Sequence, residues 1–294
     1  MPSFPVIDAH VHLWDPGRFH YPWLDGIPAL RRPFLPADYT AACGPVPVGA
    51  MVFMQCETAF AQAMDEARWV SVLAQQEPRL QAIVPWAPLE QGKGSCGYLE
   101  ELARLPLVKG VRRLIQPESD PGFCLQPGVV EGVQELARFG FSFDLCISHR
   151  QLPNTIRLVR QCPAVTFILD HIGKPDIKNR LRHPWEQELR ELARLPNVVC
   201  KLSGLVTEAD LAQWTPQDLK PYLDHVLDCF GFDRVLFGGD WPVVTLASAY
   251  PRWVAALEWA VAGCTAGDQA NLFWNNAARI YRITNKPAFM NRAA

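Results

Sequence analysis

Short apolar runs alternate with amphipathic segments along most of the chain. Runs that are bounded by turn residues and rich in β-branched or aromatic side chains predict buried strands, and apolar positions recurring every three or four residues predict helices. The expected strands span residues 6–10, 50–55, 80–86, 108–114, 141–148, 165–170, 198–202 and 235–238. The expected helices span residues 64–76, 98–104, 128–139, 152–161, 184–194, 216–229 and 251–262, with a last one near 271–281.

This alternation predicts parallel strands joined by right-handed helical crossovers. Eight such units favour an α/β protein built as a closed (β/α)8 TIM-type barrel over an open doubly wound sheet. A Rossmann-type sheet would also need a G-x-G-x-x-G turn after a strand, and the sequence contains none. Because 294 residues suit one such barrel, we expect a single domain over residues 1–294.

Residues 15–39 interrupt the rhythm of strands and helices. This segment contains five prolines and several aromatic residues, so it is too proline-rich for a helix and too aromatic for disorder. Long ordered loops at the carboxyl ends of barrel strands shape substrate pockets. We expect this loop to lie near the barrel mouth, with most of its aromatic side chains packing the loop down.

Composition and charge exclude several kinds of partner. Charged residues make up 20% of the chain and the formal net charge is −2, which gives no basic surface for nucleic acid or anionic lipid. No stretch approaches the roughly 18 apolar residues of a membrane span, and residues 1–5 lead into the first strand without the features of a signal segment. We expect a cytoplasmic protein, monomeric or a small homo-oligomer, with a small-molecule partner.

The nine cysteines are scattered and form no C-x-x-C pair. This spacing argues against a disulfide scaffold and against a zinc ribbon. Cys56 follows the second expected strand and could be a nucleophile, but packing is the favoured interpretation.

Two histidines separated by one residue, His10 and His12, end the first expected strand. Strand side chains alternate between faces, so both imidazoles point the same way, and neutral imidazole is the commonest metal ligand. The last expected strand is followed by Asp240. In a closed barrel the first and last strands are neighbours, so these three side chains would meet. The alternative is a histidine pair held by hydrogen bonds in a turn.

Polar or aromatic residues also follow the other expected strands. They are Gln55 and Glu57, Trp86, Arg112 and Arg113, His149 and Arg150, Asp170, His171 and Lys174, Lys201 and Ser203, and Trp241. Such residues converge on one face only if the barrel closes, so the fold and the site form one hypothesis.

Several motifs carry a resemblance to a known family. The chain has H-x-H from residue 10, W-D-P from 14, Y-P-W-L from 21, F-L-P-A-D from 34, G-V-R-R from 110, D-H-I-G-K-P from 170, K-L-S-G from 201 and G-D-W-P from 239. These motifs resemble the amidohydrolase superfamily. The Y-P-W-L and D-H-I-G-K-P segments are more specific and resemble its sugar-lactone hydrolases, which act on L-fucono-, L-rhamnono- or L-galactonolactones.

The resemblance implies hydrolysis of a sugar-acid lactone to the aldonic acid, with Asp240 as general base and acid. His10, His12 and Asp240 would hold a divalent metal ion, with zinc favoured. Dinuclear relatives have a bridging lysine or glutamate near the fourth or fifth strand, whereas this chain has arginines at its fourth strand end. Lys109 is a poor bridge because the strand continues past it. We therefore expect at most one metal ion, or none, since some relatives in this branch look metal-independent.

Roles for the remaining residues follow from the needs of lactone hydrolysis. We expect Asp240, His171 and His149 to be catalytic, and His149 and His171 either bind metal or donate hydrogen bonds to substrate. Expected substrate-binding residues are Trp14, Gln55, Arg113, His149, Lys174 and Trp241, with Trp14 or Trp241 as the stacking surface. Without a metal ion, protonated histidines and Arg113 would stabilise the oxyanion.

Two other functions stay open at this point. A metal-dependent decarboxylase of an aromatic or unsaturated acid would carry the same H-x-H and last-strand aspartate on the same barrel, but the loop after the first strand resembles the lactonases. A catalytically silent sugar-binding protein is disfavoured by the presence of Asp240 with both histidines. Assays for acid release and for carbon dioxide release separate the two enzymes.

Overall fold

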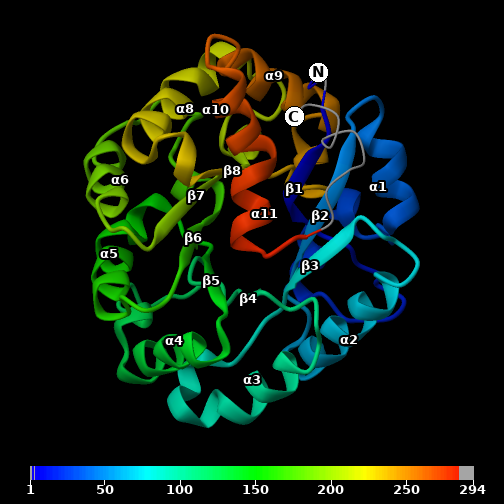
Figure 1. The fold of residues 1–294 in the computed structure, drawn as a ribbon, viewed down its shortest axis with the longest axis vertical. Helices are drawn as coiled ribbons and strands as arrows, with labels where there is room; N and C mark the ends of the chain where they lie inside the picture. Colours follow the sequence, from blue (N-terminus) through cyan, green and yellow to red (C-terminus); the bar gives the residue numbers. More distant parts are fainter. Residues whose placement is uncertain (1, 3, 285–294) are drawn as a thin grey trace.

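The computed structural model describes Pro2 and residues 4–284, and its eight parallel strands stand in a ring in chain order (Figure 1). Each strand overlaps one of the expected runs, although several are shorter. The strands are β1 Val6–Val11, β2 Val48–Met54, β3 Leu80–Val84, β4 Gly110–Val111, β5 Ser142–Leu145, β6 Phe167–Leu169, β7 Val198–Leu202 and β8 Val235–Phe237.

Backbone hydrogen bonds close the ring at both gaps between its two continuous ladders, β1-β2-β3 and β4-β5-β6-β7-β8. Between β3 and the residues before β4, the Lys109 amide donates to Ile83 O at 3.1 Å. Between β8 and β1, the Asp240 amide donates to His10 O and the His12 amide to Trp241 O, both at 2.8 Å. The expected (β/α)8 barrel is therefore confirmed, with its first and last strands side by side.

Helices surround the ring of strands (Figure 1). The helices are α1 Pro36–Cys43, α2 Ala63–Leu73, α3 Cys96–Ala103, α4 Pro127–Phe139, α5 Leu152–Gln161, α6 Trp185–Ala193, α7 Leu205–Glu208, α8 Pro216–Phe230, α9 Tyr250–Ala260, α10 Ala266–Ala270 and α11 Asn276–Ile280. None of these described helices is long and apolar enough to cross a membrane. The expected domain of 1–294 includes Met1, Ser3 and residues 285–294, which lie outside the described residues, so its extent stays a prediction.

Three of these helices, α1, α7 and α10, were not expected from the sequence, and α1 corrects the extent of the loop. Helix α1 begins at Pro36, inside the segment judged too proline-rich for a helix. Proline suits the first helical position because its missing amide proton would have no helical partner there. The Asp38 carboxylate accepts from the Leu35 amide at 2.9 Å and so caps the helix start. Helix α7 has only four residues, which is too few for apolar positions to recur every three or four residues, so the sequence pattern does not reveal it.

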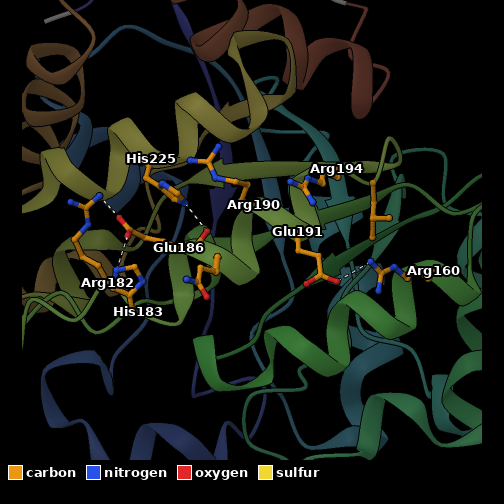
Figure 2. Close-up of a pocket in the computed structure, with 10 residues that line it drawn as sticks. Arg160, Arg182, His183, Glu186, Arg190, Glu191, Arg194 and His225 are labelled. Atoms are coloured by element: carbon orange, nitrogen blue, oxygen red, sulfur yellow. Dashed lines mark hydrogen bonds and ion pairs between the residues drawn. The ribbon is translucent and has the colours of Figure 1, made fainter.

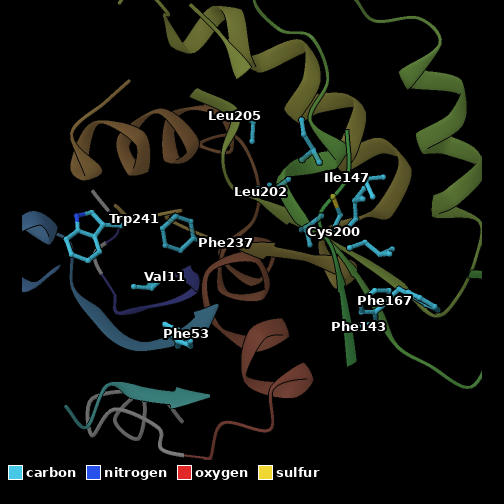
Figure 3. Packing of buried hydrophobic residues seen from close by; sticks show 14 of the residues in the cluster. Val11, Phe53, Phe143, Ile147, Phe167, Cys200, Leu202, Leu205, Phe237 and Trp241 are labelled. Atoms are coloured by element: carbon cyan, nitrogen blue, oxygen red, sulfur yellow. The ribbon is translucent and has the colours of Figure 1, made fainter. Parts of the chain in front are cut away.

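The main hydrophobic core fills the layer between the strands and the helices (Figure 3). Val11, Phe53, Phe143, Phe167 and Phe237 come from five different strands and are each at most 1% exposed. Their burial explains why these short runs form strands although few of them alternate with polar residues, since strands buried on both faces are apolar throughout.

A second cluster fills the inside of the barrel and closes its amino end. Small and medium side chains such as Ala50 and Val52 pack there against Trp274, Ala277 and Tyr281 of the C-terminal helices. A Cβ atom on Gly49, at the start of β2, would lie 2.9 Å from Trp274 Cζ3, so the C-terminal helices lie close against the starts of the strands. The open end is therefore the carboxyl end of the strands, where His10 and Asp240 lie.

The core predicts a large loss of stability when one of its aromatic rings is removed. Phe143→Ala should lower the free energy of unfolding by about 3–5 kcal/mol, because the ring is buried against Phe167 and its loss leaves a cavity. Urea denaturation followed by circular dichroism measures this change. Val72→Ala at a 54% exposed position of α2 is the control, with an expected change within about 0.5 kcal/mol. Similar midpoints for both variants would contradict this view of the core.

Candidate active site

His10, His12 and Asp240 meet at the carboxyl ends of β1 and β8, as the sequence predicted. Asp240 Oδ1 lies 3.7 Å from His10 Nε2 and 3.6 Å from His12 Nε2. All three side chains are at least nine-tenths buried. The distances exceed those of hydrogen bonds, so the three atoms surround a small space.

The partners of the two imidazoles fix their tautomers. His12 Nδ1 lies 2.9 Å from Met54 O, and a carbonyl only accepts, so Nδ1 carries the proton and Nε2 has a free lone pair. Arg112 Nη1 lies 3.2 Å from His10 Nε2 and only donates, so that nitrogen also accepts. The free lone pair of His12 Nε2 and the Asp240 carboxylate oxygen therefore face one another, with His10 Nε2 beside them on Arg112, an arrangement that favours a proton, a water molecule or a cation between His12 and Asp240.

Burial and neighbouring charges set the protonation of these groups. Burial lowers the pKa of His10 and of His12, so both rings are neutral at pH 7. Burial alone would raise the pKa of Asp240, but the positive charge that His171 and the two β1 histidines carry once protonated at low pH lowers it well below the usual range. The Asp240 carboxylate is therefore ionised and available to accept a proton.

A buried network of ion pairs contacts His10 and so supports the group formed by His10, His12 and Asp240. Lys201 Nζ on β7 lies 2.5 Å from Asp144 Oδ1 and 3.0 Å from Asp170 Oδ1. Arg112 Nη1 lies 3.3 Å from Asp170 Oδ2. Burial would raise the pKa of Asp170, but Lys201 together with His10 and Arg112 holds it well below the usual range, whereas burial raises the pKa of Asp144 to about 6.

The fixed charges around the site nearly balance. Two cations, Arg112 and Lys201, lie among three carboxylates, those of Asp144, Asp170 and Asp240. At neutral pH this leaves an excess of one negative charge in a region with little solvent, which favours one additional positive charge beside Asp240.

His171 completes the floor of the site from the end of β6. Its Nδ1 lies 2.9 Å from Ser203 Oγ, and its ring centroid lies 4.4 Å from that of His10. His171 has a left-handed backbone with φ of 54°, and so does Asp240. A Cβ atom on Gly204 would collide with the His171 ring, so the K-L-S-G glycine gives the imidazole its space.

These side chains open into a pocket of about 400 Å³. The pocket is lined by His12, Trp23, Cys56, Glu57, Arg112, Leu114, Gln116, Pro117, Cys146, His171, Lys174, Thr207, Asp240 and Val243. One side is polar and charged, and Trp23, Leu114, Pro117 and Val243 supply apolar surface. The structure thus brings together His12, His171, Lys174 and Asp240 from the expected set, with His10 beneath them.

The structure does not place the two expected stacking residues in the pocket. Trp14 is fully buried, and its indole nitrogen donates to Leu30 O at 3.1 Å and to Arg32 O at 3.0 Å. Trp241 is 1% exposed and packs against Phe34 at 5.5 Å between ring centroids. Both rings hold the loop after β1 against the barrel, which leaves no face for a sugar.

Three further expected residues lie outside the pocket lining. Arg113 donates to Glu90 at 3.2 Å, to Glu118 at 2.6 Å and to Leu114 O at 2.6 Å, so its guanidinium is committed to loop contacts. Gln55 is fully buried and bonded to Glu57 at 2.6 Å. His149 Nδ1 donates to Lys174 O at 2.9 Å, so His149 supports the backbone of Lys174.

Sequence reasoning missed Trp23 and underrated Arg112 as parts of the site. The Trp23 indole nitrogen donates to Cys56 O at 2.7 Å, which holds the half-buried ring at the pocket wall. Arg112 could have been found from strand alternation, since Lys109 lies outside the barrel with Nζ on Pro106 O at 2.8 Å. Residues 110 and 112 then face inward. Burial raises the pKa of the Cys56 thiol well above its usual range, which fits packing and not a nucleophile.

A larger hollow of about 610 Å³ lies elsewhere, on the outer face of α6 (Figure 2). Its arginines and glutamates pair along the surface, for example Arg160 with Glu191 at 2.9 Å. His225 Nε2 there donates to Glu186 O at 2.9 Å. The hollow is lined mostly by exposed, solvated charges and lies away from the strand ends, so the site is assigned to the barrel mouth.

Two groups of donors have metal-binding geometry among the described residues: His10, His12 and Asp240, and His10, Asp170 and His171. In the first group, separations of 3.6–3.7 Å are close to the roughly 3.4 Å edge of a tetrahedron with bonds of about 2.1 Å. In the second group Asp170 already contacts Arg112 and Lys201. The first group fits a divalent cation, and the second is already neutralised by side chains.

The site predicts an unusual titration for His171. Burial lowers its pKa to about 4, so the ring should stay neutral as the pH falls from 7 to 5 and become charged only near pH 4. NMR of the metal-free protein with labelled imidazole nitrogens measures this directly. The same residue in urea-unfolded protein, where a pKa near 6.5 is ordinary, is the control. Protonation near pH 6.5 in the folded protein would contradict the burial described above.

Comparisons with known proteins identify the family of this chain. An amidohydrolase family model matches residues 7–283. An L-fucono-1,5-lactonase of Burkholderia multivorans is 34% identical over 291 residues, 94% of this chain and 96% of that protein. An L-rhamnono-gamma-lactonase of Scheffersomyces stipitis is 27% identical over 234 residues, 69% of each protein.

A similar solved structure is that of an amidohydrolase from Burkholderia multivorans with bound zinc. It has a TM-score of 0.87 and 32% sequence identity, covering 96% of this chain and 100% of that chain. Since the family match extends from β1 to the last turn of the described barrel, the chain belongs to the amidohydrolase family.

Proposed function

We propose that this protein hydrolyses a sugar-acid lactone of the L-fucono, L-rhamnono or L-galactono type to its aldonic acid. The observation that carries the proposal is the convergence of three buried acceptor atoms beside the Arg112 guanidinium on the pocket floor. The curated relatives named above are lactonases, which supports this substrate class over that of a decarboxylase.

Asp240 acts as the general base. Its ionised carboxylate takes a proton from a water molecule held between its Oδ1 and the lone pair of His12 Nε2, and the water oxygen attacks the lactone carbonyl carbon. When the tetrahedral intermediate collapses, the bond from the carbonyl carbon to the ring oxygen breaks. The protonated Asp240 returns its proton to that oxygen, which leaves as a hydroxyl group of the open-chain acid.

Arg112 stabilises the charge that develops on the carbonyl oxygen. Its Nη2 is held on Gln55 O at 2.6 Å and its Nη1 near Asp170 at 3.3 Å, so the guanidinium is fixed before substrate arrives. A preorganised cation in a site with little water is more effective than one that must move into place. This role passes to Arg112 from Arg113, which the sequence had favoured.

One divalent cation fits the same floor. His10, His12 and Asp240 would hold it, and when bound it would lower the pKa of the attacking water and polarise the carbonyl. The excess of one negative charge and the closeness of the three ligand atoms support this assignment, and a bound cation would take the His10 Nε2 lone pair from Arg112. Zinc is the proposed ion, because it is bound in the similar amidohydrolase from Burkholderia multivorans.

The walls of the pocket bind the sugar. Lys174 Nζ, held on Gln116 Oε1 at 2.7 Å, and the Glu57 carboxylate offer a donor and an acceptor for hydroxyl groups. The half-buried Trp23 ring replaces Trp14 and Trp241 as the proposed stacking surface. The proposed partner remains a small molecule, and a cytoplasmic location and a monomeric or small oligomeric state stay predictions.

A panel of sugar lactones with a pH indicator, assayed with and without chelator, tests the proposal. Acid release from L-fucono-, L-rhamnono- or L-galactonolactone is expected. Carbon dioxide release from aromatic acids, without any lactone hydrolysis, would replace the proposal with the decarboxylase alternative. Restoration of lost activity by zinc after chelation would assign the cation.

Asp240→Asn should lower kcat about a thousandfold, because an amide cannot take the proton of the attacking water. The KM should change little, since the amide keeps the shape of the carboxylate. Steady-state lactone hydrolysis measures both constants. Asp25→Asn, in an exposed pair with Arg31, is the matched control and should leave kcat unchanged. A fully active Asp240→Asn protein would remove Asp240 from the mechanism.

Arg112→Met and Arg113→Met should separate the two adjacent arginines. Loss of the Arg112 guanidinium should lower kcat by about 100- to 1,000-fold, the usual effect of removing an oxyanion donor. Loss of Arg113 should lower thermal stability and leave kcat within a few-fold, because neither Arg113 nor its carboxylate partners Glu90 and Glu118 line the pocket. The reverse pattern would restore the assignment made from sequence.

A further inference from the structure

Asp8 on β1 is a buried carboxylate that the mechanism above does not use. It is fully buried, and its side chain lies between β1, α1 and α9 and contacts Tyr39 and Tyr250. Four donors surround it, so both oxygens have two partners each. Because buried polar groups are normally hydrogen-bonded and all four donors here come from specific residues, the fold provides a dedicated binding place for this carboxylate.

The two oxygens of this carboxylate have different partners. Oδ1 accepts the backbone amides of His10 at 3.0 Å and of Gly239 at 2.7 Å. Oδ2 accepts the hydroxyls of Tyr39 and Tyr250, each at 2.8 Å. One oxygen therefore joins His10 to the residue that precedes Asp240, and the other joins the strand to two helices.

Asp8 Oδ1 bridges the His10 and Gly239 amides at a place where the pairing of the strands is irregular. The register of β1 against β2 shifts between Asp8 and Val11. The Gly239 amide, which comes from the turn after the neighbouring strand β8, donates to the Asp8 side chain. A Cβ atom on Gly239 would collide with Asp8 Oδ2 and with the Tyr250 ring, so glycine permits this close approach.

We propose that Asp8 is a positioning residue, whose Oδ1 sets the spacing of 3.7 Å between His10 Nε2 and Asp240 Oδ1. The inference rests on the proposed function, because that spacing places the carboxylate that takes the proton of the attacking water and two of the ligands of the proposed cation. What the site needs from Asp8 is an acceptor for two backbone amides, and its negative charge is dispensable.

Asparagine and leucine side chains are similar in shape, so Asp8→Asn and Asp8→Leu separate the role of the hydrogen-bond acceptor from that of the negative charge. Asparagine keeps an acceptor for both amides, and the tyrosine hydroxyls can rotate to accept from its Nδ2, so kcat should stay within threefold of the wild type. Leucine removes the acceptor, so kcat should fall at least 100-fold with KM within threefold. The zinc affinity of the metal-free protein, measured by competition with a chromogenic chelator, should fall at least tenfold in Asp8→Leu only.

Tyr39→Phe is the matched control. It removes a donor from Oδ2 and leaves Oδ1 intact, so the melting temperature should fall while kcat and zinc affinity stay within threefold. If Asp8→Leu does not fold, Asp8→Ser takes its place, because one short hydroxyl cannot accept from both amides. Equal losses in Asp8→Asn and Asp8→Leu, or a folded Asp8→Leu protein with unchanged kcat and zinc affinity, would overturn the proposal.

Failure of the proposed function gives a different result. A wild-type protein that hydrolyses no lactone would refute the lactonase proposal, and the zinc affinities of the same variants would still test Asp8. Crystal structures of wild type and Asp8→Leu provide the measurement that needs neither activity nor zinc. An increase of at least 0.5 Å in the separation of His10 Nε2 and Asp240 Oδ1 is expected, and an unchanged separation would overturn the positioning role.

Discussion

The seam between β1 and β8 is the contact on which the rest of the structure depends. Residues from the two ends of the chain meet there through the Asp240 amide on His10 O and the His12 amide on Trp241 O, both at 2.8 Å. Without these bonds the sheet would have two open edges and no common mouth. The seam also brings Asp240 to His10 and His12, so the same backbone contacts close the barrel and assemble the site.

The charged groups under the site are costly to bury and are arranged so that none is isolated. Lys201 and Arg112 each contact Asp170, and Lys201 also contacts Asp144, which the Tyr281 hydroxyl bonds at 3.1 Å. Replacing such a network by apolar side chains could stabilise the fold. Its value lies instead in holding the His10 ring, because Arg112 lies 3.2 Å from Nε2 and Asp170 Oδ1 lies 3.4 Å from Nδ1. Through Asp144 the same network reaches Tyr281 near the amino end of the barrel.

Hydrophobic patterning was sufficient to predict the eight strands, because a barrel strand is apolar on both faces and its run is bounded by turns. The meeting of His10, His12 and Asp240 followed from barrel closure alone. Patterning could not place Trp14 and Trp241, since aromatic residues that pack a loop and those that stack on a ligand have the same sequence signal. Only their partners, Leu30 O and Phe34 among them, separate the two roles.

Arg112 illustrates information that the sequence contained and that was not fully used. Lys109 was expected to be a poor bridge, and its side chain lies outside the barrel on Pro106 O, so alternation puts Arg112 inside and Arg113 outside. The network around Asp8 is of another kind, because its partners come from β1, α1, α9 and the turn after β8 and are brought together only by the fold. No local pattern predicts such a contact.

Arg112 also explains why one added cation, and not two, suits this barrel. Its guanidinium lies 3.2 Å from His10 Nε2 and 3.3 Å from Asp170 Oδ2, so it already supplies positive charge to both groups. Lys201 supplies a second charge at 3.0 Å from the same carboxylate. A further cation near Asp170 would meet both Arg112 and Lys201 in contact with its carboxylate, whereas one beside Asp240 meets a carboxylate and two neutral imidazoles, with Arg112 in contact with one of them. The arginine of the fourth strand therefore takes the electrostatic place that a second metal ion would fill.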